Sequence, residues 1–279
     1  MGQSRRGERS AGKSDPIDAL AVARAALREG PESLPAAHLD EDALQLKLLL
    51  DHREDLVKAR SEDQCRLRWH LHDLWPELEL PAGCLDRTVW LDRIARKLAR
   101  AEQGTRVAIA RELVTETRRR TRRVNELERE IGALVKAQAP ELLKLAGCGA
   151  LTAAKLLAET AGAKRLASDA KFARLAGVAP IPASSGNRVR HRLDRGGNRQ
   201  LNCALHRIAV TQGRIHPPAR NYLAKKQAEG KSRIEAIRCL KRHLARRVWR
   251  LLTDSEIDRS VTTVDPQRGS LAPQIAVAA

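Results

Sequence analysis

Two long stretches of the chain repeat apolar residues every three or four positions, the spacing that places side chains on one face of an α-helix. The first runs from Leu39 to Leu78 and the second from Thr105 to Gln138. The spaced positions of the second stretch are Val107, Ala110, Val114, Thr117, Thr121, Val124, Leu127, Ile131 and Leu134. A shorter helix is predicted between them, from Asp86 to Ala101, before a turn at Gly104. This pattern predicts an antiparallel coiled coil or helical hairpin.

Further helices are predicted near both ends. At the amino end, a helix from Asp15 to Glu29 should stop at Gly30 and Pro31. Toward the carboxyl end, helices are expected over 199–212, 218–229 and 231–252, with disorder from Ser255 onward. The mainly α fold therefore divides into 1–38, a helical arm over 39–139, a domain over 140–253 and a disordered tail over 254–279.

Asp15 and Asp18 open the first predicted helix and have two interpretations. Asp15 can serve as the N-cap, with Pro16 at the first helical position and Asp18 in the first turn, where the helix dipole favours an acid. Alternatively, the two carboxylates, three residues apart on one face, can chelate one divalent cation. The residue types alone leave both interpretations open.

The segment from Glu141 to Gly162 resembles a helix-hairpin-helix motif: a short helix, the turn Gly147-Cys148-Gly149, and a second helix. In that motif the N–H groups of the turn and the following helix terminus face a DNA phosphate. Thr152 and Lys155 would join this contact from the second helix. Ala146 stands where the motif usually has a proline, and an ordinary helix-turn-helix packing unit remains the alternative.

The segment from Ala176 to Leu205 contains the closest grouping of candidate catalytic and phosphate-binding residues. Ser184 and Ser185 are adjacent and Gly186 follows at once, within a small irregular or β insertion. Five arginines come next: Arg188, Arg190, Arg192, Arg195 and Arg199. A serine before a glycine, surrounded by arginines that can hold phosphate oxygens, is typical of a nucleophile directed at a phosphodiester. A Ser-Ser-Gly turn in a basic surface loop would look the same.

Charge and composition point to a polyanionic partner. The net charge is +18, with 52 Lys and Arg against 34 Asp and Glu, which favours nucleic acid. Aromatic residues make up only 2%, which argues against base-stacking platforms and for phosphate contacts. No apolar run could span a bilayer and no signal peptide is recognisable, so no membrane association and a cytoplasmic location are expected. The five scattered cysteines predict neither disulfides nor a zinc finger.

Three features, in this order, resemble transposases of the insertion sequence 110 family, which includes the pilin-gene invertases. They are the segment Lys13-Ser14-Asp15-Pro16-Ile17-Asp18-Ala19, the long helical arm, and the block that joins the Gly-x-Gly turn to the serine–arginine segment. The resemblance covers about residues 10–253. It implies an RNase H-like (RuvC-like) domain with a DEDD site for Mg²⁺, a coiled-coil arm, and a transposase domain with a nucleophilic serine. It also implies DNA, a noncoding bridge RNA, and a homo-oligomer, either a dimer or a tetramer.

Within this resemblance, Asp15 and Asp18 match the last two acids of the DEDD set, and Ser185 matches the serine, with Ser184 as competitor. Ser185 would attack a DNA phosphate to give a covalent 5′- or 3′-linked intermediate, helped by metal. The first Asp and the Glu of the set have no counterpart, because Glu8 is the only acid before Asp15. We therefore expect a truncated copy of an RNA-guided recombinase, with a weak metal site and little activity alone. The alternatives are a non-enzymatic nucleic-acid-binding module, a dimer partner of full-length transposase, and a coiled-coil scaffold.

Overall fold

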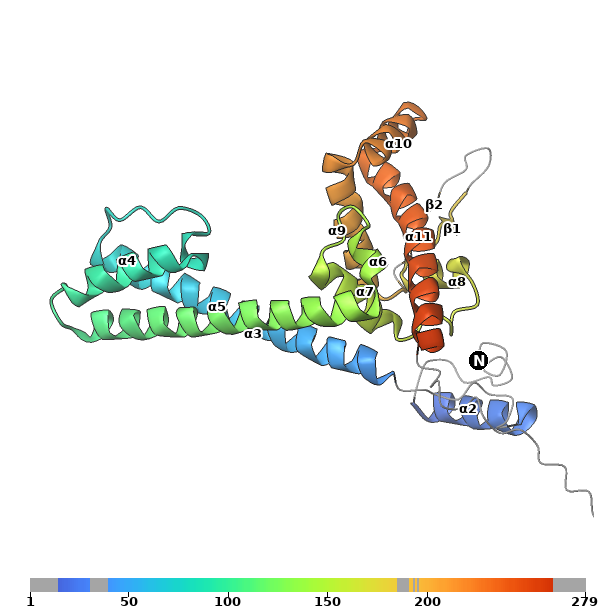
Figure 1. The fold of residues 1–279 in the computed structure, drawn as a ribbon, viewed down its shortest axis with the longest axis horizontal. Coiled ribbons are helices and arrows are strands. Elements are labelled where there is room, and N and C mark those ends of the chain that lie inside the picture. Colours follow the sequence, from blue (N-terminus) through green and yellow to red (C-terminus); the bar gives the residue numbers. More distant parts are fainter. Residues whose placement is uncertain (1–14, 31–39, 185–190, 193, 195, 263–279) are drawn as a thin grey trace, which may run out of the picture. The chain divides into compact units, whose positions relative to one another are not determined.

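The computed structural model describes residues 15–30, 40–184, 191–192, 194 and 196–262. It divides the chain between Leu39 and Asp40 into two units, which are described separately. Within the described residues there are ten α-helices, one short 3-10 helix and a single sheet of two strands (Figure 1). This confirms the predicted mainly α fold. No described helix is both long enough and apolar enough to cross a membrane.

The first unit contains one described helix, α2 (Asp15–Glu29). Its end follows from Gly30, which has a φ of +78° and donates its N–H to the carbonyl oxygen of Ala26 at 3.0 Å. The predicted bounds of this helix are confirmed. One detail is wrong: Asp15 is the first helical residue rather than the N-cap.

The second unit begins with a hairpin of two long helices, α3 (Glu41–Leu74) and α5 (Thr105–Gln138), which lie side by side (Figure 1). Asp40 caps α3 by accepting the N–H of Ala43 at 3.0 Å. The bounds of α5 agree with the prediction, and all but one of its predicted apolar-face residues are buried. The exception is Leu134, whose place is taken by the buried Val135. The predicted helical hairpin is therefore confirmed.

The tip of the hairpin holds a small core of its own. After α3 the chain forms the 3-10 helix η2 (Cys84–Asp86) and then α4 (Thr88–Ala99), a shorter helix than predicted. Buried residues of this tip core are Leu67, Leu71, Cys84, Leu85, Leu91, Ile94, Leu98, Val107, Ala110 and Val114. The tip core fixes α4 against the two long helices, so the end of the hairpin is a packed unit.

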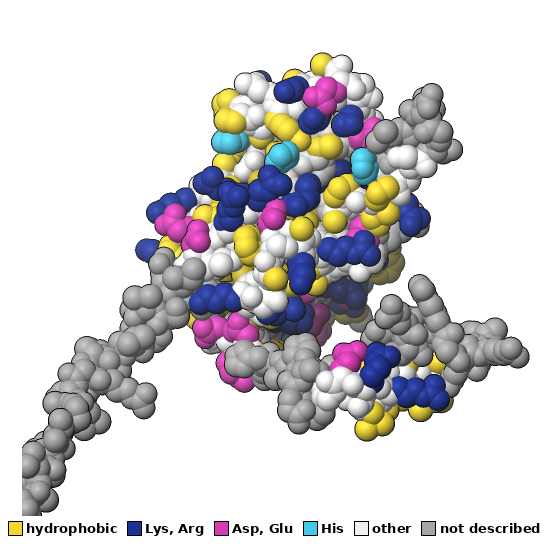
Figure 2. Space-filling view, turned by 90° about the vertical axis from the view of Figure 1, so that its right-hand side faces the viewer, with side chains coloured by type: hydrophobic (Ala, Val, Ile, Leu, Met, Phe, Trp, Pro, Cys, Tyr) yellow, Lys and Arg dark blue, Asp and Glu magenta, His cyan; other side chains and the backbone are white. Residues whose placement is uncertain are grey.

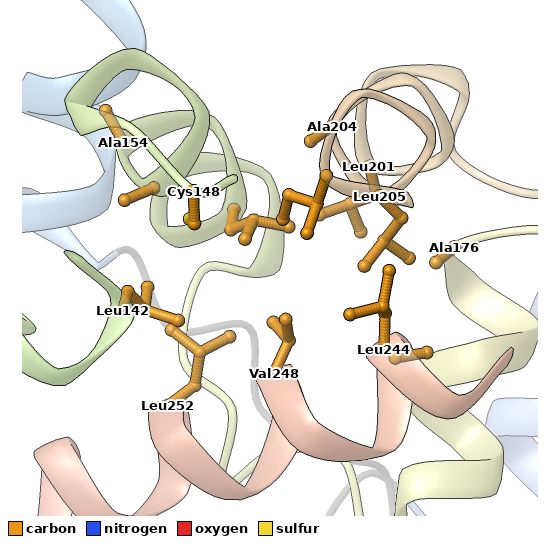
Figure 3. Packing of buried hydrophobic residues seen from close by; sticks show 14 of the residues in the cluster. Leu142, Cys148, Ala154, Ala176, Leu201, Ala204, Leu205, Leu244, Val248 and Leu252 are labelled. Atoms are coloured by element: carbon orange, nitrogen blue, oxygen red, sulfur yellow. The ribbon is translucent and has the colours of Figure 1, made fainter. Parts of the chain in front are cut away.

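The remaining elements surround the base of the hairpin: α6 (Pro140–Leu143), α7 (Ala150–Thr160), α8 (Asp169–Leu175), β1 (Ile181–Pro182), β2 (His191–Arg192), α9 (Arg199–Ile215), α10 (Pro217–Ala228) and α11 (Arg233–Thr262). Their main core is drawn in Figure 3, where Leu201 and Leu205 of α9 face Leu244 and Val248 of α11. Residues of α3 and α5, such as Leu46 and Ile131, belong to the same cluster, so the hairpin base and the carboxy-terminal helices share one core.

Helix α11 continues farther than predicted. The sequence pattern placed its end at Leu252 and disorder from Ser255, whereas the helix reaches Thr262. Leu252 and Ser255 are buried, and the Ser255 hydroxyl donates to the carbonyl oxygen of Leu251 at 2.8 Å. No glycine or proline interrupts the chain between Thr253 and Thr262, so nothing local stops the helix. Residues 263–279, the rest of the expected tail, lie outside the described residues.

A buried acid ties the two long helices together. Asp63 of α3 is 3% exposed and accepts from Arg120 of α5 at 2.7 Å and from Arg66 at 2.6 Å. Arg53 pairs with Glu128 nearer the base, and Arg106 pairs with Asp73 nearer the tip. This order of pairs along α3 and α5 fixes their antiparallel register.

Replacing Asp63 should therefore weaken the hairpin. We expect Asp63→Ala to lower the free energy of unfolding by about 3 kcal/mol, because the partly buried Arg120 guanidinium loses its closest carboxylate and keeps only Glu116, at 3.7 Å. Urea denaturation followed by circular dichroism measures this change. The matched control is Asp55→Ala, an exposed acid on the same helix, which should change stability by less than about 0.5 kcal/mol. Equal effects of the two substitutions would contradict a role for the buried pair.

Candidate nucleic-acid interface and the serine loop

The candidate nucleophiles lie on the loop that connects β1 to β2. The two strands pair antiparallel, with Ile181 opposite Arg192 and Pro182 opposite His191. This small sheet confirms that a β element accompanies the serines. Ser184 directly follows the β1 region and is exposed. The other loop residues singled out from the sequence, Ser185, Arg188, Arg190 and Arg195, lie outside the described residues.

Two glycines bring the start and the end of this loop region together. Gly197 packs against the backbone of Gly177, which has a φ of +62°. A Cβ atom at Gly197 would overlap the nitrogen and Cα of Gly177 and lie 2.9 Å from the carbonyl oxygen of Leu175. The N–H of Asn198 also donates to that Leu175 oxygen, at 2.6 Å. Only glycine allows so close an approach of the two backbones.

Asp194 is the acid that stands among the loop arginines. Its side chain is buried, and its carboxylate accepts from Arg174 at 2.7 Å and from the N–H of Gly196 at 2.9 Å. The carboxylate therefore ties the end of the loop to α8. Its charge is engaged by Arg174 and is not directed at a ligand.

Two side chains, Asn202 and Lys241, link the backbone of Ala176 and Gly177 to α11 by hydrogen bonds, and together they form the Asn202–Lys241 relay. The Asn202 amide donates to the carbonyl oxygens of Ala176 at 3.0 Å and Gly177 at 2.9 Å. Its own oxygen accepts from the ammonium group of Lys241, which is only 5% exposed. Burial lowers the pKa of Lys241 to about 8, with a smaller lowering from Arg238 and an opposing contribution from Cys203. The sequence analysis missed both Asn202 and Lys241.

A cleft of about 380 Å³ opens between the sheet, α10 and α11. Its cationic lining residues are Arg192, Lys226, Lys231, Arg238, Lys241 and Arg242. Arg242 pairs with Asp169 at 3.1 Å and Lys226 with Glu229 at 2.7 Å. Lys and Arg side chains form a band across this side of the second unit (Figure 2). Of the predicted loop arginines, the structure thus places Arg192 in the cleft.

Arg199, the last of the predicted arginines, begins α9 and is exposed. The preceding residue, Asn198, caps this helix by accepting the N–H groups of Gln200 and Leu201. The Asn198 amide also donates to Glu159 of α7 at 2.7 Å. The helix start that follows the loop is therefore fixed both by its cap and by a neighbouring helix.

The Gly-x-Gly turn packs against α9. Gly147 has a φ of +81°, and a Cβ atom there would lie 3.0 Å from Thr211. Gly149 is exposed with open space around it, and it directly precedes α7. Thr152 is half-buried in the first turn of α7. These placements fit a packed turn whose second glycine faces solvent.

Lys155, the last residue predicted at this turn, lies inside the protein. Its ammonium group pairs with Glu54 of α3 and donates to the Gln200 side-chain oxygen at 3.2 Å. The side chain therefore links α7 to α3 and α9 in this structure. Phosphate contact by Lys155 would require that pairing to open.

Helix α5 carries a cluster of five arginines, which is mostly paired with acids: Arg118, Arg119, Arg120, Arg122 and Arg123. Four of its members have a carboxylate partner: Arg118 with Asp92, Arg119 with Glu116, Arg120 with Asp63, and Arg123 with Glu126. This pairing reduces the positive charge that the hairpin offers to a polyanion. The cleft beside the serine loop is the stronger electrostatic candidate.

The candidate metal ligands Asp15 and Asp18 lie three residues apart, both in the first turn of α2. Mg²⁺ is often held by one or two carboxylates together with water and phosphate oxygens, so this donor set suits that cation. Within the part of the chain that the structure describes, no group of three or more His, Cys, Asp or Glu lies together. His70, His72 and Asp73 are close in sequence near the end of α3 and could be considered as ligands, but Asp73 pairs with Arg106.

Two family models match this chain. One described as "Transposase IS116/IS110/IS902 family" covers residues 139–224, from α6 into α10 and thus the whole serine loop. A DEDD-type insertion sequence 110 model described as "Transposase" covers residues 1–76, which include Asp15 and Asp18. The chain belongs to the insertion sequence 110 family of transposases.

Three related insertion-element proteins agree with this family. An insertion element IS110 uncharacterized 43.6 kDa protein of Streptomyces coelicolor is 28% identical, over 87% of this chain and 71% of its own length. An insertion element IS900 uncharacterized 42 kDa protein of Mycobacterium paratuberculosis is 27% identical, over 91% of this chain and 75% of its own length. An insertion element IS116 uncharacterized 44.8 kDa protein of Streptomyces clavuligerus is 27% identical, over 88% of this chain and 72% of its own length. The family thus connects this chain with transposition and DNA recombination.

The glycine contact at the loop base should tolerate no side chain. We expect Gly197→Ala to lower the free energy of unfolding by about 1–3 kcal/mol, because the added Cβ meets backbone atoms that cannot move aside. Gly132→Ala is the matched control: it lies inside α5, in the last third of the helix, where the new Cβ makes only ordinary contact at 3.7 Å. That change should raise stability by about 0.5–1 kcal/mol. Urea denaturation measures the free energy of unfolding of both variants. If Gly197→Ala left that free energy unchanged, the loop base would be loosely packed.

Lys241 should make stability depend on pH. Its ordinary pKa of 10.5 falls to about 8 in the folded protein, so between these pH values the unfolded chain binds more protons. The lysine contribution to the free energy of unfolding therefore rises from pH 8 to pH 10.5. Lys241→Met should remove this rise, which we would measure by urea denaturation across that range. The control is Lys231→Met, at an exposed position, whose curve of unfolding free energy against pH should be parallel to that of the unsubstituted protein. If the curve for Lys241→Met were also parallel, the lowered pKa of Lys241 would be contradicted.

Proposed function

We propose that this chain is a DNA recombinase of the insertion sequence 110 type, which binds DNA at the basic cleft and cleaves it with Ser185. The observation that carries the proposal is the setting of the serine loop. The strand that follows it, β2, contributes His191 and Arg192 to a cleft lined by six cations. Its base is held by the contact of Gly177 with Gly197 and by the Asn202–Lys241 relay. A serine on a loop that departs from a fixed base, beside concentrated positive charge, suits attack on a phosphodiester.

In the proposed reaction, the Ser185 oxygen attacks a DNA phosphorus atom and forms a phosphoserine ester. The bond from phosphorus to one deoxyribose oxygen breaks, and that oxygen leaves as a DNA hydroxyl after taking a proton. The serine proton passes to solvent or a nearby base. Loop arginines, proposed as Arg188, Arg190, Arg192, Arg195 and Arg199, neutralise the charge that grows on the phosphate oxygens. Ser184, one residue away, is the competing nucleophile.

Asp15 and Asp18 are proposed to hold Mg²⁺, which supplies charge neutralisation at the reacting phosphate when it is bound. The family resemblance implies four acids, and these two carboxylates are half of that set. We therefore propose that the chain alone holds the metal weakly and joins DNA little or not at all. In this proposal further acidic ligands, a noncoding bridge RNA and other copies in a dimer or tetramer complete the working assembly.

The Gly-x-Gly turn is proposed as a second contact with the DNA backbone. Gly149 is exposed at the start of α7, where backbone N–H groups favour a phosphate. Thr152 lies on the first turn of the same helix and can add a hydroxyl contact. Lys155 would join only if its pairing with Glu54 opened, so it is the weakest member of the proposed set.

A second function is a nucleic-acid-binding module without catalysis, such as a dimer partner of a full-length transposase. The observation that favours it is the lack of any cluster of three metal-ligating side chains among the described residues. Both functions require salt-sensitive binding of nucleic acid, because both depend on the same basic surface. Only the recombinase requires a covalent step.

A covalent-trapping experiment separates the two functions. The purified protein is incubated with a nicked suicide DNA substrate and Mg²⁺, and covalent protein–DNA adducts are resolved on a denaturing gel. We expect a small amount of adduct, which Ser185→Ala abolishes while DNA affinity stays within about twofold, because loss of one hydroxyl leaves the charges intact. Ser184→Ala is the matched control and should retain the adduct. Asp15→Asn and Asp18→Asn should each reduce it.

The outcomes distinguish the proposals clearly. Loss of the adduct with Ser184→Ala, and not with Ser185→Ala, would transfer the nucleophile to Ser184. Tight binding of DNA without an adduct from any version would favour the non-catalytic module. Absence of both binding and adduct would contradict both functions.

A further inference from the structure

We infer that the cleft beside the serine loop is a pocket for one unstacked nucleotide of a nucleic-acid strand, with its phosphate on the cations and its base against Tyr222. This inference rests on the proposed nucleic-acid-binding function and gives that surface a specific ligand. The volume of about 380 Å³ lies at the lower end of small-ligand sites, which span about 300–1,000 Å³. A paired duplex keeps its bases stacked inside, so only a single-stranded or extruded nucleotide can offer base and phosphate together.

The cations of the cleft are available for a phosphate. Within the described residues, no carboxylate pairs with Arg192, Lys231 or Arg238. Lys241 is buried at the same cleft, and its hydrogen-bond partner, the Asn202 amide, carries no charge. A phosphate would therefore supply the negative charge that this group of side chains lacks.

The two acids that line the cleft do not satisfy those cations. Asp194 is engaged by Arg174 and by the N–H of Gly196. Glu235 accepts both the N–H and the hydroxyl of Ser232 at 2.9 Å, in a capping arrangement at the start of α11. Both carboxylates thus have local structural partners, and the net charge of the cleft stays positive.

Other lining residues of the cleft suit a base. Tyr222 is the single tyrosine of the chain, and it lines this cleft half-buried. Its ring meets the ring of His243 edge to face, with centroids 5.1 Å apart, and Lys226 lies 5.7 Å from the ring centroid. Val178, Ala179 and Pro180 add an apolar wall. An aromatic ring held by its neighbours, beside an apolar wall, is a suitable contact for the face of a base.

Short oligomers test this pocket without any cleavage step. The probes are a fluorescein-labelled thymidylate hexamer and an abasic hexamer of the same length and charge. We expect the thymidylate hexamer to bind about tenfold more tightly, because only it offers bases to the aromatic wall. Tyr222→Leu should weaken its binding by about fivefold to tenfold and change abasic binding by less than about twofold. Tyr222→Phe, which keeps the ring, should retain the affinity for thymidylate.

A charge-matched pair tests the phosphate side. Arg238→Gln should weaken binding of both hexamers by about fivefold to tenfold, because it removes a guanidinium from the cleft. Arg250→Gln removes the same charge from the same helix outside the cleft and should weaken binding by less than about twofold. Both positions are exposed, so neither change should disturb folding, which circular dichroism checks.

Two results would overturn the nucleotide pocket. One is equal binding of the thymidylate and abasic hexamers; the other is equal weakening by Arg238→Gln and Arg250→Gln, the behaviour of general surface electrostatics. If either occurs while duplex DNA still binds, the pocket fails and the proposed function stands. If neither the hexamers nor duplex DNA bind, both fail. A uridylate RNA hexamer identifies the source of the strand: tighter binding assigns the pocket to RNA, weaker binding to DNA, and equal binding to a site that ignores the 2′-hydroxyl.

Discussion

Burial of apolar surface where the hairpin base meets the carboxy-terminal helices holds the second unit together. Leu46 of α3 and Ile131 of α5 lie in the same core as Leu201 of α9 and Val248 of α11. Because the long helices enter this core, the hairpin is anchored at one end and carries its own small core at the other. The serine loop depends on the same packing, since Arg174 of α8, Asn202 of α9 and Lys241 of α11 all take part in the hydrogen bonds that hold its base.

Charge is distributed unequally over this scaffold. The chain carries 52 Lys and Arg against 34 Asp and Glu, so its acids cannot neutralise all of its cations. On α5 the arginine cluster is largely paired, and there the charges serve helix packing and register. Around the cleft the acids are engaged elsewhere, which leaves Arg192, Lys231 and Arg238 facing a cavity. In the proposed mode of binding, long-range attraction brings a polyanion to the protein, and the cleft cations that pair with no carboxylate of the described residues determine where it makes close contact.

The buried ammonium of Lys241 connects the core to the loop. Holding this side chain inside the protein carries a desolvation penalty, which is visible in its lowered pKa. The hydrogen bond to Asn202 offsets part of that penalty, and it also orients the amide that binds the carbonyl oxygens of Ala176 and Gly177. A change in the charge state or position of Lys241 would therefore alter the hydrogen bonds that hold the backbone from which the serine loop departs.

The sequence by itself determined the elements whose causes are local. The three-four spacing gave the bounds of α5, and the glycine after Glu29 gave the end of α2, because helix periodicity and stop signals act over a few residues. The serine pair and its arginines were also found from local composition. The same reasoning failed at the end of α11, where no glycine or proline marks a stop and burial of Ser255 favours continuation.

Only the tertiary structure decided what surrounds the serine loop. Arg174 and Asp194 are 20 residues apart, Asn202 and Lys241 are 39 apart, and Lys155 and Glu54 are 101 apart. No periodicity connects such pairs, so sequence reasoning placed Lys155 on a DNA contact and overlooked Lys241. Whether a cation faces a ligand or a protein carboxylate depends on which helices pack together, and that choice is made by the core as a whole.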